Sequence, residues 1–288
     1  MKATYIDSMG TDLSVVNAAR VSFGKRSEWE YQEHETWNGL AYYLESVLSD
    51  EDRGLIQFLA RGCTSGDWEN LVAEVAEEGS DVSGGWKGTY ELEDLLNYIR
   101  KMPSHWSPFA HTAITLHLKM PIFVARQIMK HTTGIEYNEV SRRYVDSEPE
   151  FYVPDVWRKK ADNVKQGSSE EAVTHVNRDG HDEHTCLLYN DFIDVAKTLY
   201  KDMLRGGVAP EQARMVLPQS MYTEVIATGN LYAWANLYTQ RTDSHAQKET
   251  QDLAKQIGEI IQPLYPVSWK ALCGGVKAHL DEVEALIR

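Results

Sequence analysis

The sequence has few of the features that mark secreted, membrane-spanning or disordered proteins. Only three of its 288 residues are cysteine (Cys63, Cys186 and Cys273), and no pairing pattern among them indicates a disulfide framework. No apolar run approaches the roughly 20 residues that a membrane-spanning helix needs. The first residues, Met1–Asp7, contain no apolar stretch of signal-peptide length. We therefore expect a cytoplasmic protein with no membrane partner.

Basic residues are also scarce. The chain holds 29 Lys and Arg against 43 Asp and Glu, a formal net charge of −14. Such an acidic chain repels nucleic acid polymers and anionic membranes unless its basic residues are clustered. What the sequence has in plenty is material for a core, with 42% hydrophobic residues, 8 Trp and 15 Tyr, which excludes a disordered chain. An anionic ligand must therefore bind where the charge reverses locally.

The residue pattern predicts a single α+β domain over residues 1–288, with a mixed or antiparallel sheet and long helices. No long linker, repeat or low-complexity tract divides the chain. Ala113–Lys119 alternates apolar and polar side chains, which is the period of a half-buried strand. Pro121 then fits the first position of a helix that runs to about Thr133, with Gly134 as its stop.

Helices dominate the second half of the chain. A short helix is expected from Pro210 to Val216, and a long final helix from near Asn230 to about Ile261. The helix before them ends at Gly206 and Gly207. Its apolar residues recur at helical spacing: Leu188, Phe192, Val195, Ala196, Leu199 and Met203.

Two polar segments interrupt these elements. Trp68–Lys101 is acidic and broken by glycines, and we predict a surface excursion there, with a helix, a turn and a second helix across Glu91–Arg100. Lys159–His184 is similarly polar, which predicts an excursion or a mobile loop.

The charge reverses in the segment Arg126–Arg143, which holds four basic residues against two acidic ones. On the predicted helix, Gln127 shares a face with Lys130 and His131, three and four residues further on. The following loop presents Asn138, Glu139, Ser141 and Arg143. An arginine, a hydroxyl and backbone N–H groups are what a phosphate requires, and Glu and Asn suit ribose hydroxyls and base edges. The alternative is a solvated helix face and a salt-bridged turn.

A second polar cluster favours the ligand hypothesis. The final helix carries residues that compete for backbone hydrogen bonds and are poor in helix interiors. They are Asn230, Asn236, Arg241, Asp243, Ser244, His245 and Gln247. Arg214 adds a cation inside the otherwise apolar segment Gln212–Pro218, where it is expected to need a partner. Buried arginines in an acidic protein indicate an anionic small molecule.

With these residues the sequence resembles the flavin-dependent thymidylate synthases. The matching blocks occur in family order and span most of the chain. They are Ala18–Ser22, His105–Phe109, Pro121–Gln127, Tyr137–Tyr144, Arg214–Pro218 and Asn236–Gln247. Relative to that family, Trp68–Lys101 and Lys159–His184 look like insertions.

The resemblance implies a reaction in which dUMP becomes dTMP. In the family, reduced FAD accepts the methylene of methylenetetrahydrofolate and later supplies the hydride, and NADPH reduces the flavin again. The catalytic residue implied here is Arg241, which would stabilise negative charge on the uracil ring. The resemblance also implies a homotetramer whose sites are shared among subunits.

Binding residues carry over from the matching blocks. Ser141 and Arg143 would hold the phosphate. The full dUMP set implied is Gln127, Lys130, Glu139, Val140, Ser141, Arg142, Arg143, Arg214 and Arg241. The FAD set implied is Ser22, Ser107, Lys130, His131, Thr132, Asn138, Glu139, Asn230, Tyr232, Asn236 and His245. His105 would flank the flavin ring and the folate, and no metal is predicted.

The chain departs from the family pattern at several positions. Lys130-His131-Thr132 stands where the family has Arg-His-Arg, with eight residues rather than seven before Ser141. Lys130 keeps the charge without the planar fork of arginine, and Thr132 loses the charge. Ala110 replaces a Glu, and Tyr232 replaces an Arg. Most of these changes fall on the flavin side, whereas the nucleotide side is intact.

Three alternatives stay open from the sequence. The first is the same scaffold making a different 5-substituted dUMP, such as the hydroxymethyl product, because the flavin-side signature is altered. A non-catalytic nucleotide-binding relative that has lost FAD is the second. The third is a metal-dependent nucleotide hydrolase that uses His181–His184, although their spacing matches no standard metal site.

Overall fold

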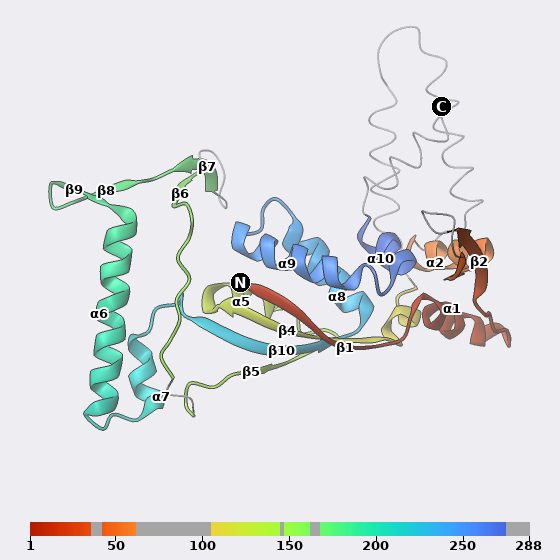
Figure 1. Ribbon diagram of the computed structural model, residues 1–288, viewed down its shortest axis with the longest axis horizontal. Helices are drawn as coiled ribbons and strands as arrows, with labels where there is room; N and C mark the ends of the chain where they lie inside the picture. The colour runs from red at the N-terminus through yellow and green to blue at the C-terminus, as the bar shows by residue number, and fades with distance from the viewer. Residues whose placement is uncertain (36–41, 62–104, 145–146, 162–167, 275–288) are drawn as a thin grey trace, which may run out of the picture. The chain divides into compact units, whose positions relative to one another are not determined.

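The computed structural model of the chain describes residues 1–35, 42–61, 105–144, 147–161 and 168–274 (Figure 1). The chain divides into two compact units, each built from separate stretches of sequence. The first unit comprises Met1–Ile6, Thr115–Thr228 and Gln240–Ile257, and the second comprises Asp7–Ile114, Gly229–Thr239 and Gly258–Arg288. The α+β class is confirmed, and the single domain over residues 1–288 stays a prediction.

The main sheet belongs mostly to the first unit and has four strands in the order β1-β4-β10-β5. Strand β4 confirms the predicted alternation, because Leu116, Leu118 and Met120 are fully buried while the residues between them are half-buried. Apolar burial on one face and polar groups on the other are typical of an antiparallel sheet. The strands are β1 (Lys2–Met9), β4 (Ala113–Pro121), β10 (Tyr222–Gly229) and β5 (Ile135–Glu139).

Polar pairs join β4 to β10 on the opposite face of the sheet. Thr115 Oγ1 lies 3.0 Å from Thr228 Oγ1. Further along β4, His117 Nε2 lies 2.9 Å from Glu224 Oε2. The partners run in opposite order along the two strands, so β4 and β10 are antiparallel.

Helix α5 (Ile122–Ile128) begins as predicted, with Pro121 as its N-cap, but ends five residues earlier than expected. The chain leaves the helical conformation at Met129, and Gly134 (φ +77°) leads it into β5. The freed carbonyl groups of Ile128 and His131 accept hydrogen bonds from Tyr137 Oη at 3.2 and 2.9 Å. These two hydrogen bonds from Tyr137 stabilise a turn that helix propensity alone does not predict.

The helix predicted before Gly206 is confirmed as α6 (Thr185–Arg205), followed by α7 (Pro210–Ala213) and a 3-10 turn to Val216. In α6, the buried face differs from the apolar face that the sequence predicted. Ile193, Ala196 and Tyr200 are buried, whereas a neighbouring apolar stripe made of Phe192, Val195 and Leu199 is about half exposed or more. No helix in the described ranges is both long and apolar enough to cross a membrane.

The single final helix predicted from Asn230 to Ile261 is wrong. The chain forms α8 (Leu231–Thr242) and α9 (Lys248–Ile261) with a break between them. At the break, Asp243 Oδ1 accepts a hydrogen bond from the backbone N–H of His245 at 2.8 Å. This local bond replaces the helical pattern, which is the competition expected of Asp. In the first unit, α9 contacts β1, where the N–H of Ala3 donates to Gln256 Oε1 at 3.1 Å.

The segment Lys159–His184, predicted as an excursion or a mobile loop, is not a loop in its described part. It contributes to two antiparallel hairpins. The β8–β9 turn contains Asp179 (φ +53°) and Gly180 (φ +87°), and His175 pairs with His184 at its open end. The strands are β6 (Arg158–Lys160), β7 (Ser168–Ala172), β8 (His175–Arg178) and β9 (His181–His184). The helices predicted within Trp68–Lys101 lie outside the described residues.

The second unit is mainly helical. Its centre includes Trp234, which is fully buried and donates from Nε1 to the carbonyl of Ile114 at 3.1 Å. The buried carboxylate of Asp12 accepts the N–H groups of Val267 and Ser268, both at 2.9 Å, and so caps α10. The elements are α1 (Asp12–Arg20), 3-10 turns at Val21–Phe23 and Ser107–Ala110, β2 (Glu30–Glu35), β3 (Tyr42–Val47), α2 (Asp50–Arg61) and α10 (Pro266–Cys273).

Candidate active site

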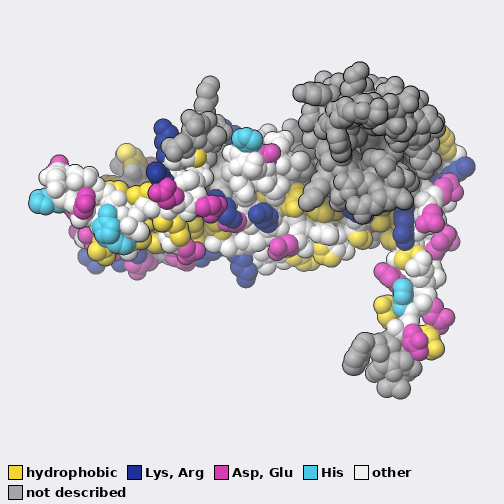
Figure 2. Space-filling model, turned by 90° about the horizontal axis from the view of Figure 1, so that it is seen from above, with side chains coloured by type: hydrophobic (Ala, Val, Ile, Leu, Met, Phe, Trp, Pro, Cys, Tyr) yellow, Lys and Arg dark blue, Asp and Glu magenta, His cyan; other side chains and the backbone are white. Residues whose placement is uncertain are grey.

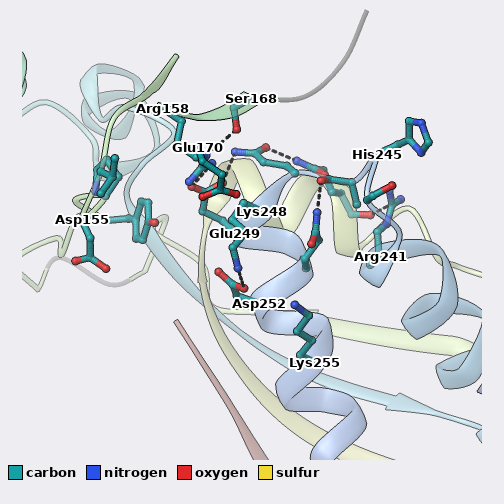
Figure 3. A pocket seen from close by; sticks show the side chains of 18 residues that line it. Asp155, Arg158, Ser168, Glu170, Arg241, His245, Lys248, Glu249, Asp252 and Lys255 are labelled. Carbon is teal, nitrogen blue, oxygen red and sulfur yellow. Dashed lines mark hydrogen bonds and ion pairs between the residues drawn. The ribbon is translucent and has the colours of Figure 1, made fainter. Parts of the chain in front are cut away.

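A cavity of about 1130 Å³ lies in the first unit (Figure 3). Ligand pockets commonly have volumes of roughly 300–1,000 Å³, so this one has room for a nucleotide and part of a second ligand. Its walls come from α5, from the chain before β6, from the β6–β7 hairpin, and from the α8–α9 break with the start of α9. They include Gln127, Arg158, Ser168, Arg241, His245, Gln247, Glu249 and Lys255.

Arg241, the predicted catalytic residue, lines this cavity and is half-buried. Its Nε donates to His131 Nε2 at 2.9 Å, and its Nη2 donates to the carbonyl oxygen of Gln127 at 3.0 Å. Both acceptors are neutral, and no carboxylate within the described ranges forms an ion pair with Arg241. The guanidinium charge is therefore not neutralised at the cavity wall, which favours an anionic ligand or an anionic transition state.

The contact with Arg241 fixes the protonation of His131. A guanidinium has only donors, so His131 Nε2 must be the acceptor and the ring must be neutral with its proton on Nδ1. Burial, and then the positive charge of Arg241, lowers the pKa of His131. The side chain predicted to bind flavin thus also holds Arg241 in place.

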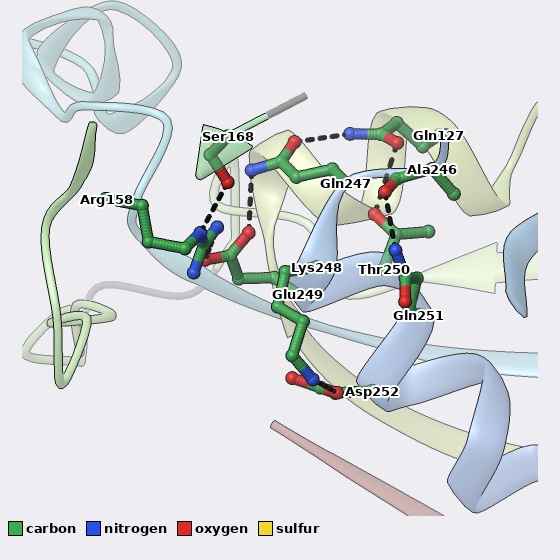
Figure 4. Close-up of polar contacts among 10 residues, drawn as sticks. All are labelled: Gln127, Arg158, Ser168, Ala246, Gln247, Lys248, Glu249, Thr250, Gln251 and Asp252. Carbon is green, nitrogen blue, oxygen red and sulfur yellow. Dashed lines mark hydrogen bonds and ion pairs between the residues drawn. The ribbon is translucent and has the colours of Figure 1, made fainter. Parts of the chain in front are cut away.

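Gln127 is oriented by two residues of the α9 region (Figure 4). Its Nε2 donates to Gln247 Oε1 at 2.7 Å, and its Oε1 accepts from Thr250 Oγ1 at 3.1 Å. Each end of the amide keeps one further hydrogen-bonding position for a ligand. Sequence reasoning missed the role of Thr250. The sequence signal for this role was the position of Thr250, three residues after Gln247 and on the first turn of α9.

A buried ion pair extends this network. Arg158 Nη2 donates to Glu249 Oε1 at 2.7 Å, and Gln247 Nε2 donates to Glu249 Oε2 at 2.9 Å. Glu249 is only 5% exposed. Sequence reasoning missed both charged residues. The available signal was the placement of Glu249 four residues before Leu253, in the buried stripe of α9 that continues to Ile257.

The predicted phosphate residues follow β5 and form a second group outside the cavity. Arg143 is exposed, its guanidinium lies 5.0 Å from the centre of the Tyr144 ring, and its N–H donates to Ser141 Oγ at 3.4 Å. Glu139 accepts a hydrogen bond from Thr223 Oγ1 at 2.6 Å. Five other predicted binding residues also do not line the cavity: Lys130, Thr132, Asn138, Val140 and Arg142.

Arg214 does not have the buried environment expected from the sequence. It is exposed at the end of α7, where its Nε donates to the carbonyl oxygen of Glu211 at 3.3 Å. The apolar neighbour Met215 is exposed as well. The turn after α7 faces outward, so Arg214 needs no buried partner and does not line the cavity.

The remaining predicted flavin residues lie in the second unit. Tyr232 packs against Trp106 with ring centres 5.9 Å apart, and His105 packs against Phe58 at 5.1 Å. Asn230 Oδ1 caps α8 by accepting the N–H of Ala233 at 2.9 Å. Three further predicted residues lie in this unit: Ser22, Ser107 and Asn236. The predicted flavin set is thus divided between the two units.

The histidine-rich hairpin β8–β9 does not resemble a metal centre. His175 and His184 contact each other with ring centres 5.1 Å apart. Figure 2 shows histidine side chains at the surface at the left of the view, where Figure 1 has β8 and β9. Over the ranges that the structure describes, no three His, Cys, Asp or Glu side chains are grouped to hold a metal ion.

Comparison with known proteins identifies the family. The model of the thymidylate synthase complementing protein family matches residues 4–267. The flavin-dependent thymidylate synthase of Thermosipho africanus is 38% identical over 65% of this chain and 79% of that protein. That of Thermus thermophilus is 36% identical over 71% of this chain and 70% of that protein.

A solved structure resembles the whole chain. It is the UMP/dUMP methylase PolB from Streptomyces cacaoi bound with 5-Br dUMP, which has a TM-score of 0.62 and 25% identity over 95% of both chains. The family match spans most of the sequence and agrees with the blocks that carry Gln127, Ser141 and Arg241. The chain therefore belongs to the thymidylate synthase complementing protein family, whose matching relatives are flavin-dependent thymidylate synthases.

Proposed function

We propose that this protein transfers a one-carbon unit from methylenetetrahydrofolate to C5 of dUMP, with FAD-mediated reduction, and so makes dTMP. Family membership implies an FAD-dependent enzyme with NADPH and methylenetetrahydrofolate as co-substrates. The observation that supports the proposal most directly is Arg241, a half-buried guanidinium at the cavity wall whose partners among the described residues are neutral.

Arg241 is suited to activate the pyrimidine. C5 of uracil is a weak nucleophile, and a cation beside the ring oxygens stabilises negative charge on the ring, which favours the electron-rich form from which C5 attacks. Two of the five guanidinium N–H groups are used by His131 and by the carbonyl oxygen of Gln127. Three remain for the substrate, and the two fixed bonds hold the planar group in one orientation.

Gln127 is suited to bind the base. An amide both donates and accepts hydrogen bonds, as the imide edge of uracil does. Its bonds to Gln247 and Thr250 set which end of the amide carries the donor. The orientation is therefore established before the nucleotide binds, which reduces the entropy cost of binding.

The donor set near the cavity fits a flavin. His131 offers its Nδ1 proton, and Lys130 and Asn138 are exposed donors that no carboxylate in the described ranges engages. Ring carbonyls and phosphates require such donors. With Thr132 and His245, they would hold part of FAD. The roles of Ser22, Ser107, Asn230, Tyr232 and Asn236, which belong to the second unit, stay predictions from the sequence. When bound, the flavin supplies the carbon carrier and the hydride.

We assign the dUMP phosphate to Ser141 and Arg143, with Arg142 beside them and Glu139 on the sugar. These residues lie outside the cavity that Arg241 lines. A site completed by a second subunit accounts for this separation and agrees with the proposed homotetramer. The exposed stripe of Phe192, Val195 and Leu199 on α6 supports self-association, since apolar patches of this kind mark protein interfaces.

The test is an assay of the purified protein with FAD, NADPH, dUMP and labelled methylenetetrahydrofolate. We expect NADPH oxidation that depends on dUMP, and labelled dTMP as the product. Omission of dUMP and omission of FAD are the controls. Hydroxymethyl-dUMP as the main product would replace dTMP synthesis with the alternative reaction. A colourless protein that FAD does not reconstitute and that forms no product would contradict the enzyme proposal.

A further inference from the structure

We propose that Arg158, at the base of the excursion Lys159–His184, is a positioning residue for the nucleotide-binding amide of Gln127. It acts through Glu249 and Gln247. The inference rests on the proposed function, because it takes Gln127 to contact dUMP. It assigns a role in substrate binding to a residue outside the six sequence blocks quoted for the resemblance, although within residues 4–267, which the family model matches.

The contact path is continuous (Figure 4). Arg158 Nη2 donates to Glu249 Oε1 at 2.7 Å, and Glu249 Oε2 accepts from Gln247 Nε2 at 2.9 Å. Gln247 Oε1 in turn accepts from Gln127 Nε2 at 2.7 Å. Both oxygens of the Glu249 carboxylate and both ends of the Gln247 amide are therefore used. Each bond sets which atom donates and which accepts in the next bond. The orientation of the Gln127 amide therefore depends on the position of the Glu249 carboxylate.

The carboxylate of Glu249 depends on Arg158. The Glu249 side chain is 6% exposed, and a buried carboxylate without a counter-charge is strongly unfavourable. Arg158 is the basic residue that forms an ion pair with it in the described part of the chain. Without Arg158, we expect Glu249 to rotate toward water in the cavity. Gln247 then loses its acceptor. The amide of Gln127 keeps Thr250, whose hydroxyl can either donate or accept, so Thr250 alone does not hold the amide in one orientation.

An arginine is required at position 158 because its guanidinium forms hydrogen bonds in two directions at once. Arg158 Nε donates to Ser168 Oγ on β7 at 2.7 Å, while Nη2 reaches Glu249 on α9. A lysine has one nitrogen and cannot reproduce this planar fork. The same guanidinium thus joins the hairpin wall of the cavity, which includes Ser168, to the helix that orients Gln127 (Figure 3).

The next residue on β6 provides a matched control. Lys159 also forms an ion pair, with Glu171 at 2.9 Å, but both side chains are about half exposed or more. Exposed pairs contribute little to stability because water competes for both charges. Lys159 does not line the cavity. Removal of its charge alters the same hairpin without touching Glu249.

The experiment measures the Kd of dUMP by calorimetry, with the FAD-loaded full chain. We expect Arg158→Met to raise the Kd about tenfold, which corresponds to ~1.4 kcal/mol, and to leave kcat at saturating dUMP within about twofold. Lys159→Met should match the wild type. The double variant Arg158→Met/Glu249→Gln should return the Kd to within about threefold of the wild type. A neutral amide at 249 still accepts from Gln247 and needs no cation.

The outcomes separate the hypotheses. A Kd for Arg158→Met equal to that of Lys159→Met would overturn this inference alone, and no binding of dUMP by the wild type would overturn the proposed function as well. If the double variant binds as weakly as Arg158→Met, Arg158 contacts the ligand directly or only supports the fold, and the positioning role is wrong. If Arg158→Met does not fold, Arg158→Lys takes its place. It should weaken binding about threefold and also be restored by Glu249→Gln.

Discussion

The two predicted substrate-binding regions of the first unit differ in how completely their side chains are held. At the cavity, the guanidinium of Arg241 and the amide of Gln127 have fixed protein partners. After β5, Arg143 is exposed, and among the described residues its guanidinium contacts the ring of Tyr144. The cavity is organised before a ligand arrives, whereas the β5 end needs a ligand or another subunit to order it. We infer that Arg241 in the cavity governs catalysis, whereas Gln127 and the β5 end govern affinity.

The largest effect should come from Arg241→Ala. Loss of one preorganised group that stabilises transition-state charge commonly costs about 10²–10³ in kcat. We expect a loss of that size in dTMP formation, with flavin absorbance retained, because the flavin set remains. Stopped assays of labelled product would measure it. Arg126→Ala, at an exposed position of α5, is the control. Equal losses in both variants would contradict a special role for Arg241.

A smaller but still large effect should follow from Val195→Glu on the exposed stripe of α6. A charge in an apolar interface is unfavourable without a partner. We expect the assembly to dissociate from four times the 32.8 kDa chain mass to smaller species. Activity should fall more than about tenfold if the phosphate residues come from a second subunit. Light scattering and the dTMP assay, run at the same concentration, measure both.

Asn190→Glu places the same charge on another face of α6 and should leave the mass unchanged. The shared-site proposal would be wrong if Val195→Glu dissociates the assembly while each chain keeps full activity.

Arg143→Ala tests the β5 end of the comparison. A charge-assisted hydrogen bond to phosphate contributes about 1.5–3 kcal/mol, so we expect the KM for dUMP to rise about tenfold or more. The kcat should change little, because the group does not touch the reacting ring. Added salt should weaken binding to the wild type more than binding to the variant. A fall in kcat with KM unchanged would reverse the roles assigned to the two regions.

Local sequence patterns predicted much of this arrangement. The alternation along Ala113–Lys119, the turn at Gly206 and the short helix from Pro210 all depend on neighbouring residues and are confirmed. The helix break at Asp243 was also a local signal, because Asp and Ser are poor in helix interiors. The error was to place these residues on one continuous helix.

What the sequence did not predict depends on distant contacts. Arg158 and Glu249 are 91 residues apart, and no local pattern indicates that they pair. The face of α6 that packs inside was likewise set by tertiary contacts, since Tyr200 is buried and Leu199 is exposed. Arg214 was predicted to be buried from its apolar neighbours alone, and the outward turn after α7 exposes it.

The smallest effect concerns pH and the contact between His131 and Arg241. Burial and the nearby guanidinium lower the pKa of His131, so the folded protein favours the neutral ring. In the unfolded chain the ring titrates near its ordinary pKa of 6.5. As the pH falls below that value, the unfolded state takes up protons first, and stability decreases. Protonation also removes the acceptor that holds Arg241, so kcat/KM should fall a few-fold on the acid side.

His131→Gln separates these causes, because its amide oxygen accepts from Arg241 at every pH. We expect the variant to keep much of the activity at pH 7.5. Its kcat/KM, measured from pH 5.5 to 8, should fall less steeply toward acid pH, which gives a flatter acid limb of the pH profile. His117→Gln is the matched control, since His117 lies on the exposed face of β4 beside Glu224. An acid limb that is unchanged by His131→Gln would show that another group controls it. Arg241 would then keep its orientation through the carbonyl of Gln127 alone, and the organisation of the cavity would depend on the backbone of α5 rather than on its histidine.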